Sequence, residues 1–472
     1  MKKTVKIAFA VVIFVLGMLL MTSCGEKNDD SGVISAAINE KDQLVVAFAD
    51  GRIETVAEIE DGNLTVFEDA EIKVEVSSRG FWVIDGKSTS IKAKDSNGEF
   101  IKTNLDEFEF TLKDGTYSVK AGENFNSENI IFPKNYRGVP VTEIESGAFY
   151  NTKQLKSVII PNSFKTLGNG CFETCENLRA VAIGSGVETI PYSSFKYCSS
   201  LERVVIGSGV KSVMNSAFYK CKAIESVYIG SIEQWCSVQL NVTGRFHLEE
   251  EGGSPLEYGA DLYCSGELVK NLVIPEGITR LNNSVFANCT SIKSAFISST
   301  AWIGSSVFKG CPNLVEVTLD DTEGLGDEAF ADCKKLKNVD LGNELTVINM
   351  SSFRGCESLK SIELPESLDY IADGAFENCT GLVDFILPEN VTAIGNFAFK
   401  GCSSLKTFYI GEKMKLIGNF AFQDCNKLSL VKYSIKKGDF ESIEIGEGNE
   451  PFTKAEKTFD GEEEFIFRIH NS

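Results

Sequence analysis

The stretch VTAIGNFAFKGCSSLKTFYIGEK, from Val391 to Lys413, shows the repeat unit of this chain. Its LKTFYI segment alternates buried-type and exposed-type residues, which is the pattern of a short β-strand. The VTAI segment indicates a second short extended piece, and the G-x-x-A-F-x-x-C part between them indicates a tight turn or a single helical turn. A unit of this size cannot bury its apolar side alone, so it predicts stacking against further copies.

The same pattern recurs along most of the chain. Its Phe is spaced by 23 residues in the first four copies and by 22 or 23 residues in a second run of seven. These phenylalanines are Phe149, Phe172, Phe195, Phe218, Phe286, Phe308, Phe330, Phe353, Phe376, Phe399 and Phe422. A Cys follows three residues after each of them except the first, where Thr152 stands. Phe218 and Phe286 are 68 residues apart, close to three repeats, so we interpret 230–271 as degenerate coils with loops rather than as an inserted domain.

These units resemble the BspA-type leucine-rich repeats of bacterial surface proteins, whose pattern is close to V-T-x-I-G-x-x-A-F-x-x-C-x-x-L-x-x-V-x-I-P. The resemblance covers about residues 125–472 and implies a repeat solenoid, a β-rich right-handed superhelix. YIGSIEQWCSV and SPLEYGADLYCSGE resemble a variant repeat of the family, and so does the C-terminal IEIGEGNEPFTKA, where Phe440 replaces the expected Trp. The family contains adhesins and binders of host or matrix proteins, so the resemblance implies binding without naming a ligand.

Residues 1–23 predict export from the cytoplasm. Lys2 and Lys3 precede the apolar run IAFAVVIFVLGMLL, which is short for a membrane span of about 20 residues and is typical of a secretory signal. The run ends in MTSC, which resembles the lipobox of bacterial lipoproteins and implies that Cys24 is acylated after cleavage. The alternative is an ordinary signal peptide with an incidental Cys. Residues 24–32 are interpreted as an acidic tether, so we expect a lipid anchor in a membrane and a place on the outer cell surface.

Three segments between residues 33 and 140 carry Asp-Gly between alternating apolar and polar residues. They are DQLVVAFADGRIETV, FWVIDGKSTSIKA and FEFTLKDGTYSVK. Asp-Gly predicts a β-hairpin there, because a type I′ turn needs two residues with positive φ. We expect small all-β units over 33–105, a hairpin and cap over 106–140, the solenoid over 141–434, and a C-terminal variant repeat or cap over 435–472.

Fourteen cysteines in an exported protein would ordinarily suggest disulfides. Ten of them occupy one place per repeat, between apolar positions, which indicates a buried ladder of reduced thiols. The ladder consists of Cys175, Cys198, Cys221, Cys289, Cys311, Cys333, Cys356, Cys379, Cys402 and Cys425. Neighbouring coils would bring cysteines within disulfide range, so geometry does not exclude pairing. Cys236 and Cys264 lie outside the ladder and are candidates to pair with each other.

Composition argues against several other functions. The net charge is -21, and an acidic surface repels phosphate backbones, so we expect no nucleic-acid partner. The two histidines, His247 and His470, leave little room for His-based catalysis or metal binding. HLEEEGG, from His247 to Gly253, is interpreted as a solvated loop, and the sequence has no nucleophile elbow or Walker motif. We therefore expect no catalytic residue, no metal and no cofactor.

The residue between Val and Ile in L-x-x-V-x-I should point away from the core, because strand side chains alternate. In successive repeats it is Ile159, Ala182, Val205, Tyr228, Phe296, Thr318, Asp340, Glu363, Ile386, Tyr409 and Lys432. The first five are apolar or aromatic, so Ile159, Val205, Tyr228 and Phe296 form a candidate ligand face. Such residues also simply suit a sheet surface, and the loops of 230–271 could cover this stripe.

The leading functional hypothesis is a cell-surface lipoprotein whose solenoid binds host, matrix or other cell-surface proteins. The first alternative is a glycan-binding surface lipoprotein for nutrient capture, which would favour several exposed Trp platforms. The chain has only Trp82, Trp235 and Trp302, of which Trp302 alone falls in a regular repeat. The second alternative is a surface enzyme that uses carboxylates of the solenoid.

Overall fold

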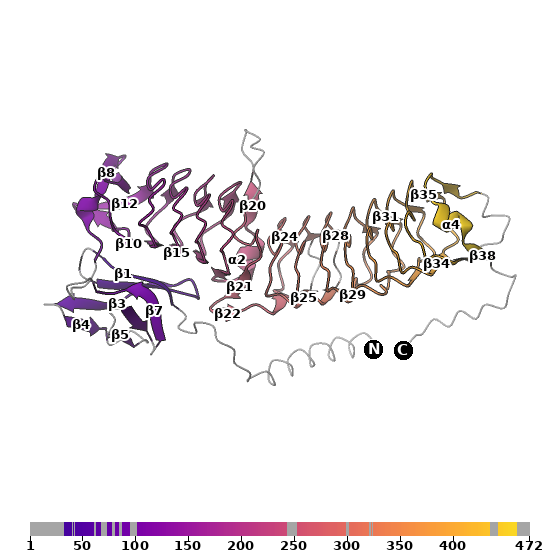
Figure 1. The fold of residues 1–472 in the computed structure, drawn as a ribbon, viewed down its shortest axis with the longest axis horizontal. Helices are drawn as coiled ribbons and strands as arrows, with labels where there is room; N and C mark the ends of the chain where they lie inside the picture. The colour runs from indigo at the N-terminus through magenta and orange to yellow at the C-terminus, as the bar shows by residue number, and fades with distance from the viewer. Residues whose placement is uncertain are drawn as a thin grey trace.

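The computed structural model is an elongated solenoid with a small β-sandwich packed against its N-terminal part (Figure 1). The structure describes residues 33–459, except 40, 42, 61–62, 68–72, 78–80, 85–86, 95–101, 243–252, 299–301, 321, 323 and 435–441. The signal peptide, Cys24 and the tether predicted over 1–32 lie outside the described residues, and so do His247 and His470.

Regular coils contribute one strand to a front sheet and a shorter strand to a back sheet, at the lower and upper edges of the array in Figure 1. Neighbouring coils pair in parallel with equivalent residues side by side, as Val158 beside Val181 and Val181 beside Val204. The predicted repeat solenoid is therefore confirmed.

The front sheet is hydrogen-bonded in three sections. The first contains β10 (Asn129–Ile131), β13 (Ser157–Ile160), β15 (Ala180–Ile183), β17 (Arg203–Ile206), β19 (Ser226–Ile229), β21 (Asp261–Cys264) and the antiparallel β22 (Glu267–Leu268). The second contains β23 (Asn271–Ile274), β25 (Ser294–Ser298), β27 (Glu316–Asp320) and β29 (Asn338–Asp340). The third contains β32 (Asp384–Ile386), β34 (Thr407–Ile410), β36 (Leu430–Tyr433) and β38 (Glu456–Phe459).

The back sheet has four sections. They are β12 (Val139–Ile144) with β14 (Thr166–Leu167); β16 (Thr189–Ile190), β18 (Ser212–Met214) and β20 (Gln239–Val242); β24 (Arg280–Leu281), β26 (Trp302–Ile303) and β28 (Gly324–Leu325); and β30 (Val347–Ile348), β31 (Tyr370–Ile371), β33 (Ala393–Ile394), β35 (Leu416–Ile417) and β37 (Glu444–Ile445).

A hairpin closes the N-terminal end of the solenoid. It follows the short helix η1 (Leu105–Glu107) and consists of β8 (Phe108–Lys113) and β9 (Thr116–Ala121), and β9 pairs in parallel with β12. Asp114 and Gly115 have φ of 52° and 81°, as the predicted Asp-Gly turn requires. Phe108 packs on Phe149, the first phenylalanine of the repeats, with ring centroids 6.1 Å apart. On the far side of β12 lies the short β11 (Asn135–Tyr136).

The N-terminal sandwich consists of two antiparallel sheets. One contains β1 (Val33–Ile38), β2 (Gln43–Phe48), β3 (Ile53–Glu60) and β4 (Asn63–Val66), and the other β5 (Val74–Val76), β6 (Phe81–Ile84) and β7 (Lys87–Lys92). Successive side chains of β2 alternate between two cores. Val46 and Phe48 pack in the core that holds Trp82, whereas Val45 and Ala47 pack against the solenoid.

The core of the solenoid is a ladder of stacked phenylalanines beside a ladder of cysteines. Consecutive rings within the two regular runs lie 5.2–5.5 Å apart with interplanar angles of 14° or less. All ten ladder cysteines are buried free thiols. In nine of them the Sγ atom lies 2.9–3.3 Å from the carbonyl oxygen of the Phe in the preceding coil, to which the thiol donates. The thiol thus ties each coil to its neighbour.

Residues 230–271 keep the solenoid continuous with an altered coil. They contain the helix α2 (Ile232–Cys236), β20, β21 and β22, and place only β21 and β22 between β19 and β23. In regular coils the N–H of the Phe donates to the residue before the next Phe, as Phe195 does to Ala217. The buried Trp235 indole N–H makes the equivalent bond to Val285 at 2.7 Å, so this side chain replaces a missing coil contact.

The last coil ends in α4 (Glu450–Lys454) and β38. Phe452 of α4 is buried and stacks on Phe422 with ring centroids 4.7 Å apart, which continues the phenylalanine ladder by one member. Phe440, the predicted replacement for the Trp of the variant repeat, lies outside the described residues.

Candidate binding face

The N-terminal sandwich covers the first section of the front sheet. Ile159, Val205 and Tyr228 are buried there in one apolar cluster with Ile34 and Val45 of the sandwich. The expectation that these three side chains face a ligand is therefore wrong for this structure. Their cover among the described residues is the sheet of β1–β4.

The cover extends along the whole first section. At its beginning, the Ile131 N–H donates to Thr103 Oγ1 at 3.2 Å. At its end, the turn between β2 and β3 lies close to the solenoid. A Cβ atom built on Gly51 in that turn would lie 3.9 Å from the Gly230 nitrogen, and a Cβ atom built on Gly266 would lie 4.0 Å from the Asp50 nitrogen. The β2–β3 hairpin therefore reaches the β21–β22 turn, and the front sheet becomes open only from β23 onward.

The open part of the front sheet keeps the outward row of the repeat. Phe296, the fourth predicted ligand-face residue, lies here half-buried beside Thr318, and the row becomes acidic at Asp340. It turns apolar again at Ile386, whose side chain is 56% exposed, and at the half-buried Tyr409. We call the sequence Ile386, Tyr409, Lys432 and Thr458, adjacent in the strand register, the distal row.

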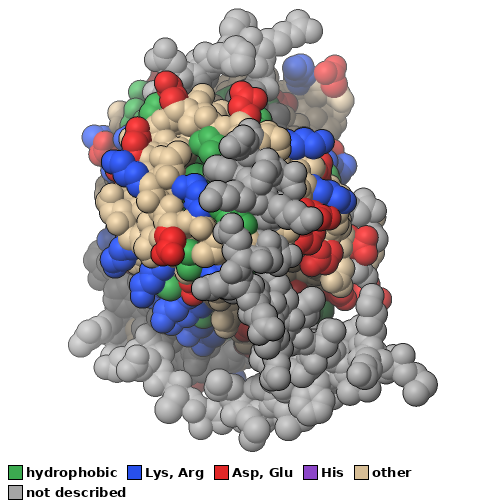
Figure 2. Space-filling view, turned by 90° about the vertical axis from the view of Figure 1, so that its right-hand side faces the viewer, with side chains coloured by type: hydrophobic (Ala, Val, Ile, Leu, Met, Phe, Trp, Pro, Cys, Tyr) green, Lys and Arg blue, Asp and Glu red, His purple; other side chains and the backbone are tan. Residues whose placement is uncertain are grey.

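A shallow groove lies at the carboxyl ends of the strands that carry the distal row. Its floor is apolar and contains the buried Leu387, Ile410 and Phe459. On its rim, the Glu389 carboxylate accepts from the Glu412 N–H at 2.8 Å and from the Ser434 hydroxyl at 3.0 Å, which fixes its position. Charged side chains of both signs are interspersed at this end of the molecule (Figure 2), so the groove offers apolar contact inside a polar rim.

The distal row itself is held by an aromatic contact. The Lys432 ammonium lies 5.2 Å from the centre of the Tyr409 ring, within the range of a cation–π interaction. Tyr409 lies on a strand bonded on both sides, between β32 and β36. The arrangement can place an aromatic ring and an aliphatic side chain on a partner surface at low entropic cost.

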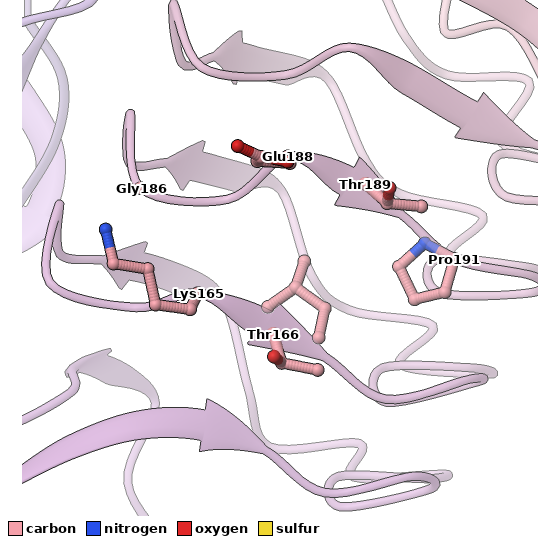
Figure 3. Close-up of a pocket in the computed structure, with 7 residues that line it drawn as sticks. Lys165, Thr166, Gly186, Glu188, Thr189 and Pro191 are labelled. Carbon is pink, nitrogen blue, oxygen red and sulfur yellow. The ribbon is translucent and has the colours of Figure 1, made fainter.

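A second depression lies between β14 and β16 on the back sheet (Figure 3). In several other coils the N–H of the residue at this position donates to the preceding coil, as Gly168 does to Ile144 and Gly395 to Ile371. Pro191 stands in this place and has no N–H. β14 pairs only with β12 and β16 only with β18, so the gap exposes strand edges rather than reactive groups.

The ionisable groups of this gap do not make an acid–base pair. Lys165 and Glu188 line it from neighbouring strands, and Glu188 bonds Lys211 at 2.8 Å. That hydrogen bond lowers the pKa of Glu188, so the carboxyl group stays ionised.

The ladder thiols are chemically quiet. Burial raises the pKa of Cys333 and Cys425 to about 12, so thiolate, the reactive form, is scarce near neutral pH. Cys236 is buried and Cys264 half-buried, and both are free thiols in the structure. Within the described ranges, no three His, Cys, Asp or Glu side chains come together in a way that would hold a metal ion.

The coils, their parallel sheets and the stacked phenylalanines define a leucine-rich-repeat solenoid. The family model of the BspA type leucine rich repeat region matches six copies, at residues 118–237, 259–368 and 323–444, which together span more than half of the chain. The chain belongs to this family. No helix in the described part of the chain has the length and apolar character to cross a membrane.

Solved structures of bacterial leucine-rich-repeat proteins are similar at low identity. A leucine-rich repeat protein from Bacteroides ovatus is 22% identical, with 76% of this chain and 100% of that chain covered and a TM-score of 0.45. A leucine rich cell surface protein from Faecalibacterium prausnitzii is 20% identical, with 72% of this chain and 96% of that chain covered and a TM-score of 0.33. The pneumococcal vaccine antigen PcpA is 18% identical, with 75% of this chain and 97% of that chain covered and a TM-score of 0.45. The search of curated proteins gave no match.

Proposed function

We propose that this chain is a lipid-anchored cell-surface protein that binds another protein through the open part of its front sheet. A repeat solenoid offers an extended rigid surface, which is how such folds ordinarily act in recognition. The observation that carries the proposal is the distal row, where Ile386 is 56% exposed next to the aromatic Tyr409 on strands held rigid by their neighbours.

The apolar residues of the open front sheet and their polar surroundings support a protein partner. An exposed aliphatic residue alone is ordinary, but an aliphatic–aromatic pair next to an apolar groove and inside a polar rim has the anatomy of an interface core. Phe296 and the exposed Val273, which are neighbours in the strand register, form a second apolar patch on the same face. A host, matrix or other cell-surface protein that spans several coils fits this arrangement.

The test uses protein partners captured from host matrix and cell-surface extracts by the chain and confirmed one at a time in purified form. The double variant Ile386→Ala, Tyr409→Ala should weaken such a complex by a factor of about 10 or more, because central aromatic and aliphatic contacts dominate interfaces. Leu416→Ala is the matched control, since Leu416 is 41% exposed on the back sheet of the same coils. Unchanged affinity of the double variant would reject the open front sheet as the binding face.

The anchoring part of the proposal rests on the sequence MTSC at Cys24, which lies outside the described residues. Cys24→Ala should block lipid attachment, so the protein should appear in the medium or persist as uncleaved precursor. Membrane fractionation and metabolic labelling with a fatty-acid analogue measure this directly. Normal cleavage with full membrane retention of the variant would contradict the anchor.

A further inference from the structure

One indole ring lies flat against the outside of the back sheet. Trp302 is the first residue of β26, and its register partners are Arg280 in β24 and Gly324 in β28. Leu325 points into the core, so a Cβ at Gly324 would point outward, and there it would overlap with carbons Cε3, Cζ3 and Cη2 of the Trp302 ring. The six-membered ring therefore covers Gly324 with one face.

The opposite face of this ring is open. Trp302 remains 39% exposed although its ring rests on the neighbouring strand, so no residue that the structure describes covers the outer face of the ring. Gly324 is the only Gly at this strand position in the described back strands. Glycine within a strand often marks the close approach of another group, and here it makes room for the ring.

Arg280, the charged residue beside Trp302 in the strand register, forms no ion pair with a described residue. Arg280 is exposed on the strand before Trp302, about 4.8 Å away in the hydrogen-bonding direction. Its guanidinium is a planar fork of five N–H donors. The indole leans over β28, whereas Arg280 lies on β24 at the other side of Trp302, so a ligand stacked on the ring meets the guanidinium where it extends back across β26.

We propose that Trp302 and Arg280 form a carbohydrate-binding site, separate from the front sheet. A pyranose ring has an apolar face of C–H groups that stacks on an indole, and hydroxyl or carboxylate oxygens at its edge that accept from a guanidinium. A protein hot spot would instead need surrounding contacts that exclude water, which Arg280 and Gly324 do not supply. A purely structural role, in which the indole shields the Gly324 backbone, explains why the ring stacks there. It does not explain why Arg280 forms no ion pair with a described residue.

The site lies on the other side of the molecule from the proposed protein-binding face. β24 and β28 run along the upper edge of the array, opposite to the N-terminal sandwich and the front sheet (Figure 1). A solenoid can therefore hold a glycan and a protein at the same time, and failure of one proposal leaves the other standing.

Trp302 is its own reporter. Trp82 and Trp235 are 1% and 0% exposed, so a neutral quencher such as acrylamide should reach only Trp302 efficiently in the native full chain. The probes are oligosaccharides of cellulose, mannan, xylan and chitin, together with the acidic oligogalacturonate and sialyllactose. At least one of them should shift the emission of Trp302 and protect it from acrylamide, and Arg280→Gln should abolish any preference for the acidic members.

Two variants separate stacking from general effects. By calorimetry, Trp302→Ala should weaken binding of the protecting sugar by about tenfold or more, and Gly324→Ala should weaken it while the indole is retained, because the added methyl lifts the ring from the sheet. Leu416→Ala, equally exposed in the same sheet, should bind as the parent does. The proposal is overturned if no sugar of the panel protects Trp302, or if Trp302→Ala binds the sugar unchanged.

Discussion

At the scale of the residue, Phe376 and Phe397 in neighbouring coils show how position decides what one side chain contributes. Phe376 is buried between Phe353 and Phe399, with both ring centroids 5.4 Å away. Phe397 is 39% exposed and has φ of 58°, in the left-handed region that costs a bulky residue about 1–2 kcal/mol.

These two positions predict opposite outcomes of truncation. Phe376→Ala should lower the free energy of unfolding by about 3–5 kcal/mol, because it leaves a cavity inside the ladder. Phe397→Gly should leave stability nearly unchanged, because the lost contact with Phe420 is offset by relief of the left-handed backbone. Denaturant unfolding followed by circular dichroism compares the two, and a cost below about 1 kcal/mol for Phe376→Ala would contradict the ladder.

The buried thiols predict a pH dependence of stability. Burial raises the pKa of Cys333 and Cys425 from 9.0 to about 12 in the folded chain. An unfolded thiol ionises from about pH 9, whereas the folded one does not, so the contribution of these groups is complete below pH 9 and is lost as the pH rises to about 12.

Thermal unfolding between pH 7 and pH 11 should therefore show a melting temperature that falls above pH 9. A variant with Cys333→Ala and Cys425→Ala should lose part of this slope and be less stable at neutral pH. Thiol labelling of the native protein at pH 8 should be slow for the same reason. Rapid labelling of most ladder cysteines without denaturant would refute their burial.

At the scale of the element, the junction between β14 and β16 should be the weak point of the back sheet. The N–H groups of Lys211 and Ser212 bond the Glu188 carbonyl across the next junction, at 2.8 and 3.2 Å. No equivalent bond joins β16 to β14, since these strands do not pair. Amides at 187–190 should consequently exchange with deuterium faster than those at 210–214, as measured by mass spectrometry of the native chain. Equal protection of both segments would argue that Pro191 does not open the sheet.

The regular strands and turns were predictable because each repeat carries the same pattern of apolar and polar residues. LKTFYI and its equivalents predict strands with an alternating buried side, and eleven in-phase phenylalanines predict the stack. The Asp114-Gly115 hairpin followed from the positive φ that such a turn needs. Local pattern was sufficient wherever a residue's partners are its own equivalents in adjacent coils.

The cover of the front sheet was not predicted, because it depends on contacts between distant segments. Ile159 and Val205 do point away from the solenoid core, but the sandwich buries them. A signal was present in the run LVVAF of β2, since a strand without polar alternation is typical of burial on both faces. Similarly, the repeat length alone did not show that Trp235 of α2 replaces a coil contact.

At the scale of the whole molecule, the N-terminal sandwich buries an apolar part of the solenoid surface. The outward row of the first section, including Ile159 and Val205, would otherwise be an exposed hydrophobic stripe. What remains open is the front sheet from β23 to β38 and the back sheet with Trp302. The proposed protein-binding face therefore lies on the distal coils, away from the N-terminal sandwich.

Hydroxyl-radical footprinting of the native full chain, alone and with a purified protein partner, tests this account most directly. Ile386 and Tyr409 should be oxidised readily in the free chain, while Ile159, Val205 and Tyr228 should be protected by the sandwich. With the partner present, Ile386 and Tyr409 should become protected, and Leu416 on the back sheet should remain reactive. Oxidation of Ile159 and Tyr228 at the rate of Ile386, or partner protection confined to the back sheet, would contradict the account.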